Sequence, residues 1–481
     1  MSRLLPLAAA CVLPFALRAQ EQFGVVNGNY DPTDAVMLNP ARIAGQWPYA
    51  QVRILGAHSY VWNDLVAMTG SEHTLTGEIQ AGVKGSPSVG LGVRGAFFPD
   101  DKEGFVQGDL NGPAVSCALG MGTIAAGIRA RSFTSISGVP THLGRFIYEG
   151  LNYGPQLGIR YRDQGVKALS AGWAQIDLSY ARILHAAGFS MWSVGATARY
   201  LQGIYGAGVQ FDVLEYTVID SMRAQVHEAT GSYGYATPGL GAGQGWGADL
   251  GVVYERTLEE CDRYLPHGAS TGCEPMGYRY RIGFALLDLG RIKYGDAIAG
   301  SFSGAEATFP DYTAVNIGDA RTADSLFSSA LDRWTDQREF RIGTPTAISL
   351  QADLRLVDKV YVALDAVQQI SGSNGTRLRR PNSIALVPRV EMKRFALAVP
   401  VVLTDYDARH PSVGLMLRMN DLLIGSDNVL PFFTRRDVRG ADIYLALRWT
   451  IFRSPYCRGK RKGRKQARPG STEALPCLIP G

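Results

Sequence analysis

Beyond its first twenty residues, the sequence lacks any run of about 18 apolar residues, the length that a transmembrane helix needs. Charged residues make up only 19% of the 481 positions, and no Pro- or Ser-rich hinge divides the chain. These absences argue against a helical membrane protein and against a series of separate soluble domains. The sequence does contain 56 glycines and 22 tyrosines, a composition typical of many short strands and turns.

Motifs for catalysis or metal binding are also missing. The seven histidines are scattered singly, without metal-binding spacing, and no Cys-x-x-Cys pair exists. Gly268 to Gly272 reads Gly-x-Ser-x-Gly, but it lies inside a short loop and not between a strand and a helix. Gly90 to Gly95 reads Gly-x-Gly-x-x-Gly, yet apolar residues alternate with these glycines as in a strand. We therefore expect no catalytic residue, no metal site, no cofactor and no enzymatic activity.

A period of two dominates the apolar segments. Between Ala441 and Phe452, Ile443, Leu445, Leu447, Trp449 and Ile451 fall on one side and Asp442, Tyr444, Ala446, Arg448 and Thr450 on the other. The same division recurs from Thr346 to Leu356 and from Arg394 to Thr404. Such alternation indicates β-strands with one apolar and one polar face.

Two all-β architectures explain this alternation. In a soluble sandwich the apolar face is the core, whereas in a transmembrane barrel it faces lipid and the polar face lines a lumen. The barrel accounts better for aromatic residues eight positions apart, Trp192 and Tyr200, because such barrels carry aromatic girdles. It also accounts for charged residues on the inward side. We therefore predict a transmembrane antiparallel β-barrel of about 14 strands, with Asp249, Asp353, Arg355 and Arg448 facing the lumen.

The N-terminus predicts export. Arg3 precedes an apolar run from Leu4 to Leu17, and Ala19 offers a cleavage site, so residues 1–19 read as a secretory signal peptide. An exported barrel without transmembrane helices belongs in the cell outer membrane, with outer-membrane lipid as its surroundings.

Export to an oxidising compartment bears on how the cysteines pair and on what surrounds the C-terminal tail. Cys261 and Cys273 bracket a polar loop, so a local disulfide is expected between them in an oxidising compartment, and Cys457 and Cys477 form a second candidate pair. Residues 454–481 form a basic tail with seven positive charges and one negative charge, while the rest of the chain is nearly neutral. Export argues against nucleic acid as a partner, and the tail is expected to be solvated or to touch anionic head groups.

Four short motifs point to a family. They are Leu38 to Ala41, Gly245 to Gly251, Leu286 to Gly290 with Ile292 to Tyr294 after it, and Ile424 to Asn428. Together they resemble an uncharacterised Bacteroidetes outer-membrane barrel family, which is similar to the long-chain fatty-acid transporters and to the shuttle barrels of type IX secretion. The resemblance implies that Asn39, Pro40 and Ala41 belong to an N-terminal hatch folded into the lumen. The alternative is a turn that only starts the first strand, since Asn before Pro favours a turn.

The expected organisation is therefore a signal peptide at 1–19, a hatch-like segment at 20–48, a barrel at 49–453 and a basic tail at 454–481. Val218 to Gln244 and Arg291 to Pro345 are expected to be long irregular segments at one rim, the second with a short helix around Ala323 to Trp334. Two functions remain open. One is passage or capture of small apolar molecules through a plugged lumen. The other is a non-transport role with envelope or secretion-system proteins as partners. An apolar pocket behind Asn39 would favour the first function, and a filled polar lumen the second.

Overall fold

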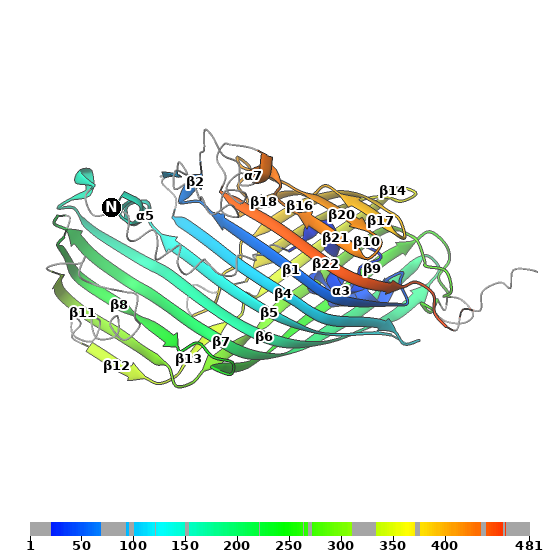
Figure 1. The fold of residues 1–481 in the computed structure, drawn as a ribbon, viewed down its shortest axis with the longest axis horizontal. Coiled ribbons are helices and arrows are strands. Elements are labelled where there is room, and N and C mark those ends of the chain that lie inside the picture. The colour runs from blue at the N-terminus through cyan, green and yellow to red at the C-terminus, as the bar shows by residue number, and fades with distance from the viewer. Residues whose placement is uncertain are drawn as a thin grey trace, which may run out of the picture.

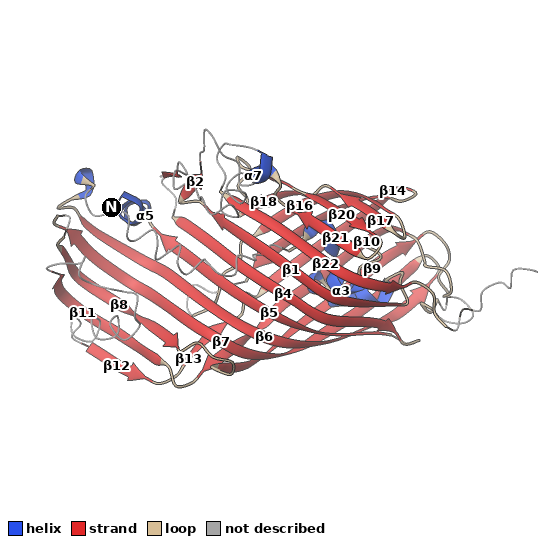
Figure 2. Cartoon of the chain, in the orientation of Figure 1, coloured by secondary structure: helices blue, strands red, loops and turns tan. Residues whose placement is uncertain are grey.

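The computed structural model of the chain describes residues 21–68, 93–95, 101–120, 122–149, 153–220, 222–262, 264–267, 272–309, 333–370, 376–433, 439–455 and 457. Strands dominate these residues (Figure 2). None of the helices in the described part of the chain combines the length and the hydropathy that a membrane crossing requires.

The strands form one closed antiparallel barrel. β1 (Ala50–Asn63) pairs with β22 (Gly440–Ile451) on one side and with β4 (Lys102–Ala118) on the other, which closes the wall. Among the described residues the wall has 14 strand positions, and two of them are each built by two short strands in line. The remaining wall strands are β5 (Thr123–Val139), β6 (Arg160–Ala187), β7 (Ser190–Val218), β9 (Gly243–Thr257), β10 (Tyr278–Tyr294), β14 (Ala347–Val357), β15 (Val360–Gln369), β16 (Ser383–Glu391), β17 (Phe395–Ala398) with β18 (Val401–Thr404), β19 (Ser412–Val413) with β20 (Leu415–Met419), and β21 (Leu422–Ser426).

The wall is much taller on one side than on the other. β7 has 29 residues, whereas β14, β15 and β16 have 11, 10 and 9. Residues 190–203 of β7 pair with β9, and residues 206–218 pair with β8 (Ala224–Ala236), which continues to β11 (Ile298–Phe309) and β12 (Arg333–Gln337). β13 (Phe340–Gly343) returns to pair with β10. Figure 1 shows this extension, formed by β8, β11, β12 and residues 206–218 of β7, beside the first half of the long strand β6 and beyond the ends of β9 and β10.

The extension corrects one sequence expectation. The segments Val218 to Gln244 and Arg291 to Pro345 were expected to be largely irregular, but β8, β11, β12 and β13 lie within them. Their glycine-rich composition hid the strands, because glycine weakens the apolar alternation that identifies a strand. Residues 323–332 of the expected helix lie outside the described residues, and Trp334 belongs to β12.

Short elements complete the described chain. Helix α5 (Thr141–Glu149) and the 3-10 turn η2 (Gly154–Gln156) lie between β5 and β6, and α7 (Leu430–Phe433) lies between β21 and β22. β2 (Val66–Met68) and β3 (Val93–Gly95) form a separate two-stranded ribbon. Phe146 of α5 packs with Tyr216 and Val218 near the far end of β7, so this helix has a small apolar core of its own.

The two faces of the wall confirm the predicted alternation. In β22, Leu445, Leu447 and Trp449 are 42%, 44% and 60% exposed on the outer face. Tyr444 and Arg448 are buried on the inner face. The expected all-β barrel is therefore confirmed, and its polar positions point inward because the apolar ones occupy the outside.

Aromatic pairs mark two levels on the outer face. Trp192 of β7 lies 4.8 Å from Tyr254 of β9, measured between ring centroids. Eight residues further along both strands, Tyr200 lies 5.2 Å from Trp246. The short turns, such as the one at Gly188 between β6 and β7, lie at the end next to Trp192. The extension lies beyond the opposite pair.

The disulfide expected between Cys261 and Cys273 is wrong. Cys273 is bonded to Cys457, 184 positions later, and Cys261 is a buried free thiol within hydrogen-bonding distance of the Ser190 carbonyl. Proximity in sequence suggested the local pair, but the fold brings the end of β22 beside the β9–β10 loop. Cys457 was likewise expected to pair with Cys477, which lies outside the described residues.

Candidate functional site in the barrel interior

Residues 21–49, here called the inner segment, lie inside the barrel (Figure 1). They contain α2 (Phe23–Val26), α3 (Pro32–Leu38) and the 3-10 helix η1 (Pro40–Gly45). Phe23, Val25, Val26 and Leu38 are fully buried in one cluster with twelve residues of the wall, from β14 to β22. Six of those twelve are alanines, and small side chains leave the space that the inner segment occupies.

The turn Asn39, Pro40 and Ala41 contacts the wall directly. The Asn39 Oδ1 accepts a hydrogen bond from the Ala41 amide at 2.9 Å and so caps η1, while Pro40 suits its first position. The Asn39 Nδ2 donates to the backbone carbonyls of Val252 and Phe284, each at 3.2 Å. The sequence signal at Asn39 to Ala41 thus corresponds to a turn that bonds to β9 and β10.

Two paired glycines receive this turn. Gly195 of β7 and Gly251 of β9 are direct cross-strand partners. A Cβ on Gly195 would lie 2.5 Å from the Ala41 nitrogen, and a Cβ on Gly251 would lie 2.1 Å from the Asn39 Oδ1. Any side chain at either position would therefore displace the turn.

Buried ion pairs hold α3 to the seam between the first and last strands. Asp34 lies 3.2 Å from Arg53 of β1 and 3.1 Å from Arg448 of β22. Asp31 pairs with the same Arg448 and lies 3.5 Å from Arg418 of β20. All five side chains are at most 5% exposed. Charges this deeply buried are stable only when each has its partner.

Further anchors bind the start of the inner segment. The Asp427 carboxylate accepts hydrogen bonds from the Phe23 amide at 2.6 Å and from the Tyr444 hydroxyl at 3.0 Å. The Glu391 carboxylate accepts from the Asn29 amide at 2.7 Å and from its Nδ2 at 3.0 Å. These acceptors lie at the ends of β16 and β21, three wall positions apart, so the start of the segment is fixed to the wall at two separate points.

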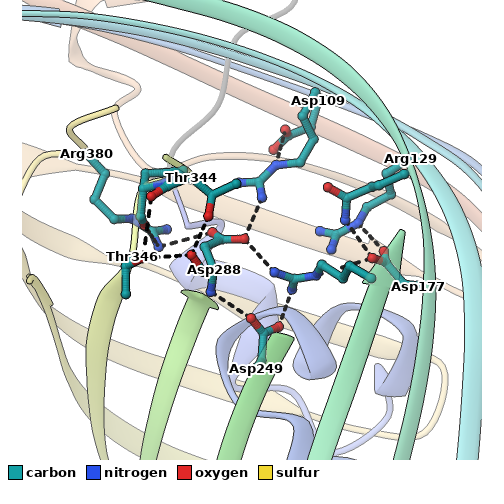
Figure 3. A network of polar contacts seen from close by, with 12 residues as sticks. Asp109, Arg129, Asp177, Asp249, Asp288, Thr344, Thr346 and Arg380 are labelled. Atoms are coloured by element: carbon teal, nitrogen blue, oxygen red, sulfur yellow. Dashed lines mark hydrogen bonds and ion pairs between the residues drawn. The ribbon is translucent and has the colours of Figure 1, made fainter. Parts of the chain in front are cut away.

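A charged layer crosses the interior beside η1 (Figure 3). Asp288 is its centre: Arg131 donates to it at 2.8 Å, Arg199 at 2.5 Å, and Arg380 approaches at 3.5 Å. The layer comprises Asp109, Arg129, Arg131, Asp177, Arg199, Asp249, Asp288 and Arg380. Its four arginines and four aspartates balance one another, which lets them stay buried.

Asp288 lies at an irregularity in the wall. β10 bulges between Leu286 and Leu289, where its pairing with β9 shifts, and Asp288 has a φ of +51°. The Asp288 amide donates to Asp249 at 2.7 Å, and its carbonyl accepts from the Thr344 and Thr346 hydroxyls at 2.6 and 2.8 Å. The bulge turns the carboxylate inward, and side chains replace the missing ladder hydrogen bonds.

Apolar residues line the interior beyond the charged layer. Phe133, Trp173, Tyr294 and Ile342 belong to one buried cluster, and Arg131 lies over the Phe133 and Trp173 rings at 5.9 and 5.4 Å. A cavity of about 560 Å³ adjoins this cluster on the inner side of the extension. Eight of its fifteen lining residues are apolar, aromatic or glycine, among them Leu169, Phe340 and Ile342, and the other seven are polar or charged, among them Glu339 and Arg341.

Three of the four residues predicted to face the lumen lie buried in the interior. Asp249 belongs to the charged layer, Arg448 binds the inner segment, and Asp353 accepts from Arg389 at 2.7 Å. Arg355 is the exception. Its side chain is 22% exposed and donates to Asp358 at 2.7 Å, because β14 ends two residues later at a turn. The odd or even position of a residue along a strand predicts which face its side chain occupies, but not how deeply that side chain is buried.

Sequence reasoning missed most of the partners. Asp31, Asp34, Arg131 and Arg199 lie at positions whose significance appears only when distant strands are adjacent. A signal did exist in the short motifs: those around Leu286 and Ile424 contain Asp288 and Asp427, as the one around Gly245 contains Asp249. Each of these carboxylates accepts a buried hydrogen bond.

The interior offers arginine–carboxylate pairs and amide contacts. Within the described ranges, no three His, Cys, Asp or Glu side chains gather as metal ligands would. The charged layer lies between the section of the lumen that the inner segment occupies and the apolar cluster.

Comparisons with known proteins bear on the barrel. A model of a family of unknown function, DUF5723, matches residues 100–427, and no curated protein sequence matches the chain. The chain is similar to the solved structure of the Pseudomonas putida toluene transporter TodX, at 11% identity and a TM-score of 0.41, over 88% of this chain and 94% of that one. For the Ralstonia pickettii toluene transporter TbuX the values are 10% and 0.36, over 87% and 93%. At such values the likeness concerns the barrel shape alone.

Proposed function

We propose that this chain, which belongs to DUF5723, a family of unknown function, is an outer-membrane barrel that captures a small, mainly apolar molecule. The barrel then passes this molecule through a lumen plugged by the inner segment.

The outer face supports the membrane placement. Its apolar side chains form a continuous exterior on the wall strands, and exposed residues such as Leu250, Ile282 and Leu350 would be costly in water. The pairs Trp192–Tyr254 and Tyr200–Trp246 stand eight residues apart, a spacing that suits the apolar band of about 25 Å between two aromatic girdles. By the rule that short turns face the periplasm, the extension would project outside the cell.

The cavity beside the apolar cluster is the observation that carries the proposal. It opens on the inner side of the extension, and Leu169, Phe340 and Ile342 belong both to its lining and to the cluster or its packing partners. Ligand pockets are typically of this size and combine apolar and aromatic groups with polar ones, and this cavity has both kinds of lining. An apolar molecule bound there would lie above the charged layer, outside the section that the inner segment fills.

Passage then requires the inner segment to move. Its described contacts with the wall are hydrogen bonds, ion pairs and apolar packing, and the wall closes through β1 and β22 without using the segment as a strand. Displacement would therefore leave the strand ladder intact while exposing buried charges to water.

Binding of the fluorescent apolar probe N-phenyl-1-naphthylamine to the purified barrel tests capture. We expect saturable binding that Leu169→Gln weakens at least about tenfold, since a polar amide would enter the apolar part of the lining. Leu240→Gln is the matched control, because Leu240 is 75% exposed in the β8–β9 loop. Absence of saturable binding to the wild type, or equal binding by both variants, would exclude capture in this cavity.

Deletion of Asp31 to Ala44 tests passage. Uptake of apolar and small polar solutes into vesicles should rise while the barrel keeps its heat-modifiable migration in detergent gels. The deletion is best made together with Arg53→Gln and Arg448→Gln, because it removes the carboxylates that these arginines pair with. An assembled barrel with unchanged permeability to every solute would remove the transport function.

One observation favours the second function, an assembly role with envelope proteins as partners. The lumen behind Asn39 is filled and polar: Gln351 and the backbone carbonyls of Val252 and Phe284 surround its amide. If the deletion above leaves permeability unchanged, the inner segment is a structural core, and the extension is the surface for a partner.

A further inference from the structure

Polar side chains cross the outer face just beyond the Tyr200–Trp246 pair. Ile292 and Tyr294 of β10 are buried inward, so Arg291 and Lys293 point outward. The cross-strand register places two rows there. The nearer row contains Tyr200, Trp246 and Arg291, and the farther row contains Gln244, Lys293 and Arg341; together they are called the donor patch.

The donor patch is accessible and hollowed. Trp246 is 71% exposed, the Lys293 side chain is 48% exposed, and Arg291 and Arg341 are exposed. A depression of about 610 Å³ is lined by Tyr200, Gln244 and Lys293 of the patch, together with Gln202, Thr237 and Asp296. Hydroxyl, amide and ammonium donors therefore surround a space large enough for a head group.

The charge of the surroundings remains positive. Glu339 pairs with Lys293 at 2.5 Å, and Asp296 lines the depression. Three cations thus face two carboxylates. The Lys293–Glu339 pair is about half exposed, and such pairs contribute little, so Lys293 is free to exchange its partner. The patch complements a ligand with more than one negative charge.

The position of the patch indicates what that ligand is. It adjoins the aromatic pair at the end that the proposed orientation places in the outer leaflet. Leu250 and Phe284, exposed on β9 and β10 on the other side of Trp246, would lie against acyl chains. A ligand that occupies both regions has an anionic head group and lipid tails.

We propose that the donor patch binds the phosphate-bearing head group of an outer-leaflet lipid. This inference rests on the membrane placement of the proposed function but not on capture or passage. Arg291, Lys293 and Arg341 would contact phosphate oxygens, Gln244 and Tyr200 would donate further hydrogen bonds, and Trp246 would lie at the boundary between head group and tails.

Native mass spectrometry of the detergent-purified protein tests the site. The probes are lipid A carrying two phosphates, its dephosphorylated form, and inorganic phosphate in excess as competitor. The wild type should retain the phosphorylated lipid and not the dephosphorylated one. Arg291→Gln/Lys293→Gln/Arg341→Gln should weaken retention at least about tenfold. Arg182→Gln/Arg256→Gln is the matched control, because both side chains point outward near the opposite aromatic pair.

Heat-modifiable migration checks that every variant is assembled. Equal retention of the two lipids, equal weakening by both sets of substitutions, or displacement by inorganic phosphate alone would each overturn the proposal. Arg341 also lines the capture cavity, but Arg291 and Lys293 do not, so the double variant Arg291→Gln/Lys293→Gln should bind N-phenyl-1-naphthylamine as the wild type does. A failed lipid site and a failed capture site are therefore distinguishable.

Discussion

Arg53 of β1 and Arg448 of β22 are direct cross-strand partners in the seam that closes the barrel. Like charges opposite each other destabilise a strand pair, and these two are buried. Asp34 of the inner segment lies between them, 3.2 Å from the first and 3.1 Å from the second. The inner segment thus supplies the charge that the seam requires.

Asp34→Asn should weaken the closed barrel. The substitution leaves two buried arginines facing each other with only Asp31 nearby, and breaking a buried pair in this way costs about 3 to 5 kcal/mol. The temperature at which the folded band disappears in detergent gels should fall. Adding Arg53→Gln should restore much of the loss, whereas Asp358→Asn, at an exposed turn, should change nothing. A seam that tolerates Asp34→Asn would show that the arginine pair is solvated.

Gly195→Ala should disturb the turn at Asn39. The added methyl would lie 2.5 Å from the Ala41 nitrogen, and overpacking of this kind costs about 1 to 3 kcal/mol. Gly247→Ala is the control on the neighbouring strand, because its nearest contact would be 3.4 Å. Limited proteolysis of the N-terminal residues should accelerate in the first variant only. Equal protection in both would mean that the turn is not held against β7.

Leu447→Arg tests the outer face. Leu447 is 44% exposed there, and a charge at mid-membrane costs about 2 to 4 kcal/mol. Assembly into lipid vesicles should drop, while Leu447→Phe should assemble normally. Ala446→Arg, on the inner face, should also fail, because Ala446 packs in the cluster that contains Phe23. Normal assembly of Leu447→Arg would contradict a lipid-facing position.

Mass spectrometry of a non-reduced digest should link the peptides that contain Cys273 and Cys457. The bond closes a long loop, so Cys457→Ser should lower the stability by up to about 5 kcal/mol. Cys261→Ser should leave the linked peptides unchanged. A linked Cys261–Cys273 peptide in envelope-derived protein would contradict the fold at this end of the barrel.

The alternation of apolar and polar residues within single segments was enough to predict the barrel, because each strand places its apolar residues on the outer face independently of the other strands. The faces of Leu447 and Arg448 follow from residues within one segment. The partner of Arg448 does not: Asp31 lies 417 positions away, and only closure of the seam brings the two together. Arg355 shows a related limit, since the end of β14 and not its parity decides its environment.

The inner segment was signalled by Asn39 to Ala41, but its ion pairs were not. Nothing in the sequence around Asp31 and Asp34 reveals that each pairs with an arginine of the wall. The cavity was hidden for another reason. Its wall includes Gly208 and Gly234, whose lack of side chains gives no apolar signal and yet creates the space.

The bond between Cys273 and Cys457 bears on the order of events during biogenesis. In a chain exported from its N-terminus, Cys273 emerges shortly after Cys261, and Cys457 follows 184 residues later. A short loop closes at lower entropic cost than a long one, so before Cys457 arrives a bond between Cys261 and Cys273 would be the less costly one to form. If that bond forms, the final linkage would need thiol–disulfide exchange once the last strand has arrived. Maturation of this barrel would accordingly depend on an isomerase activity in the compartment where it folds.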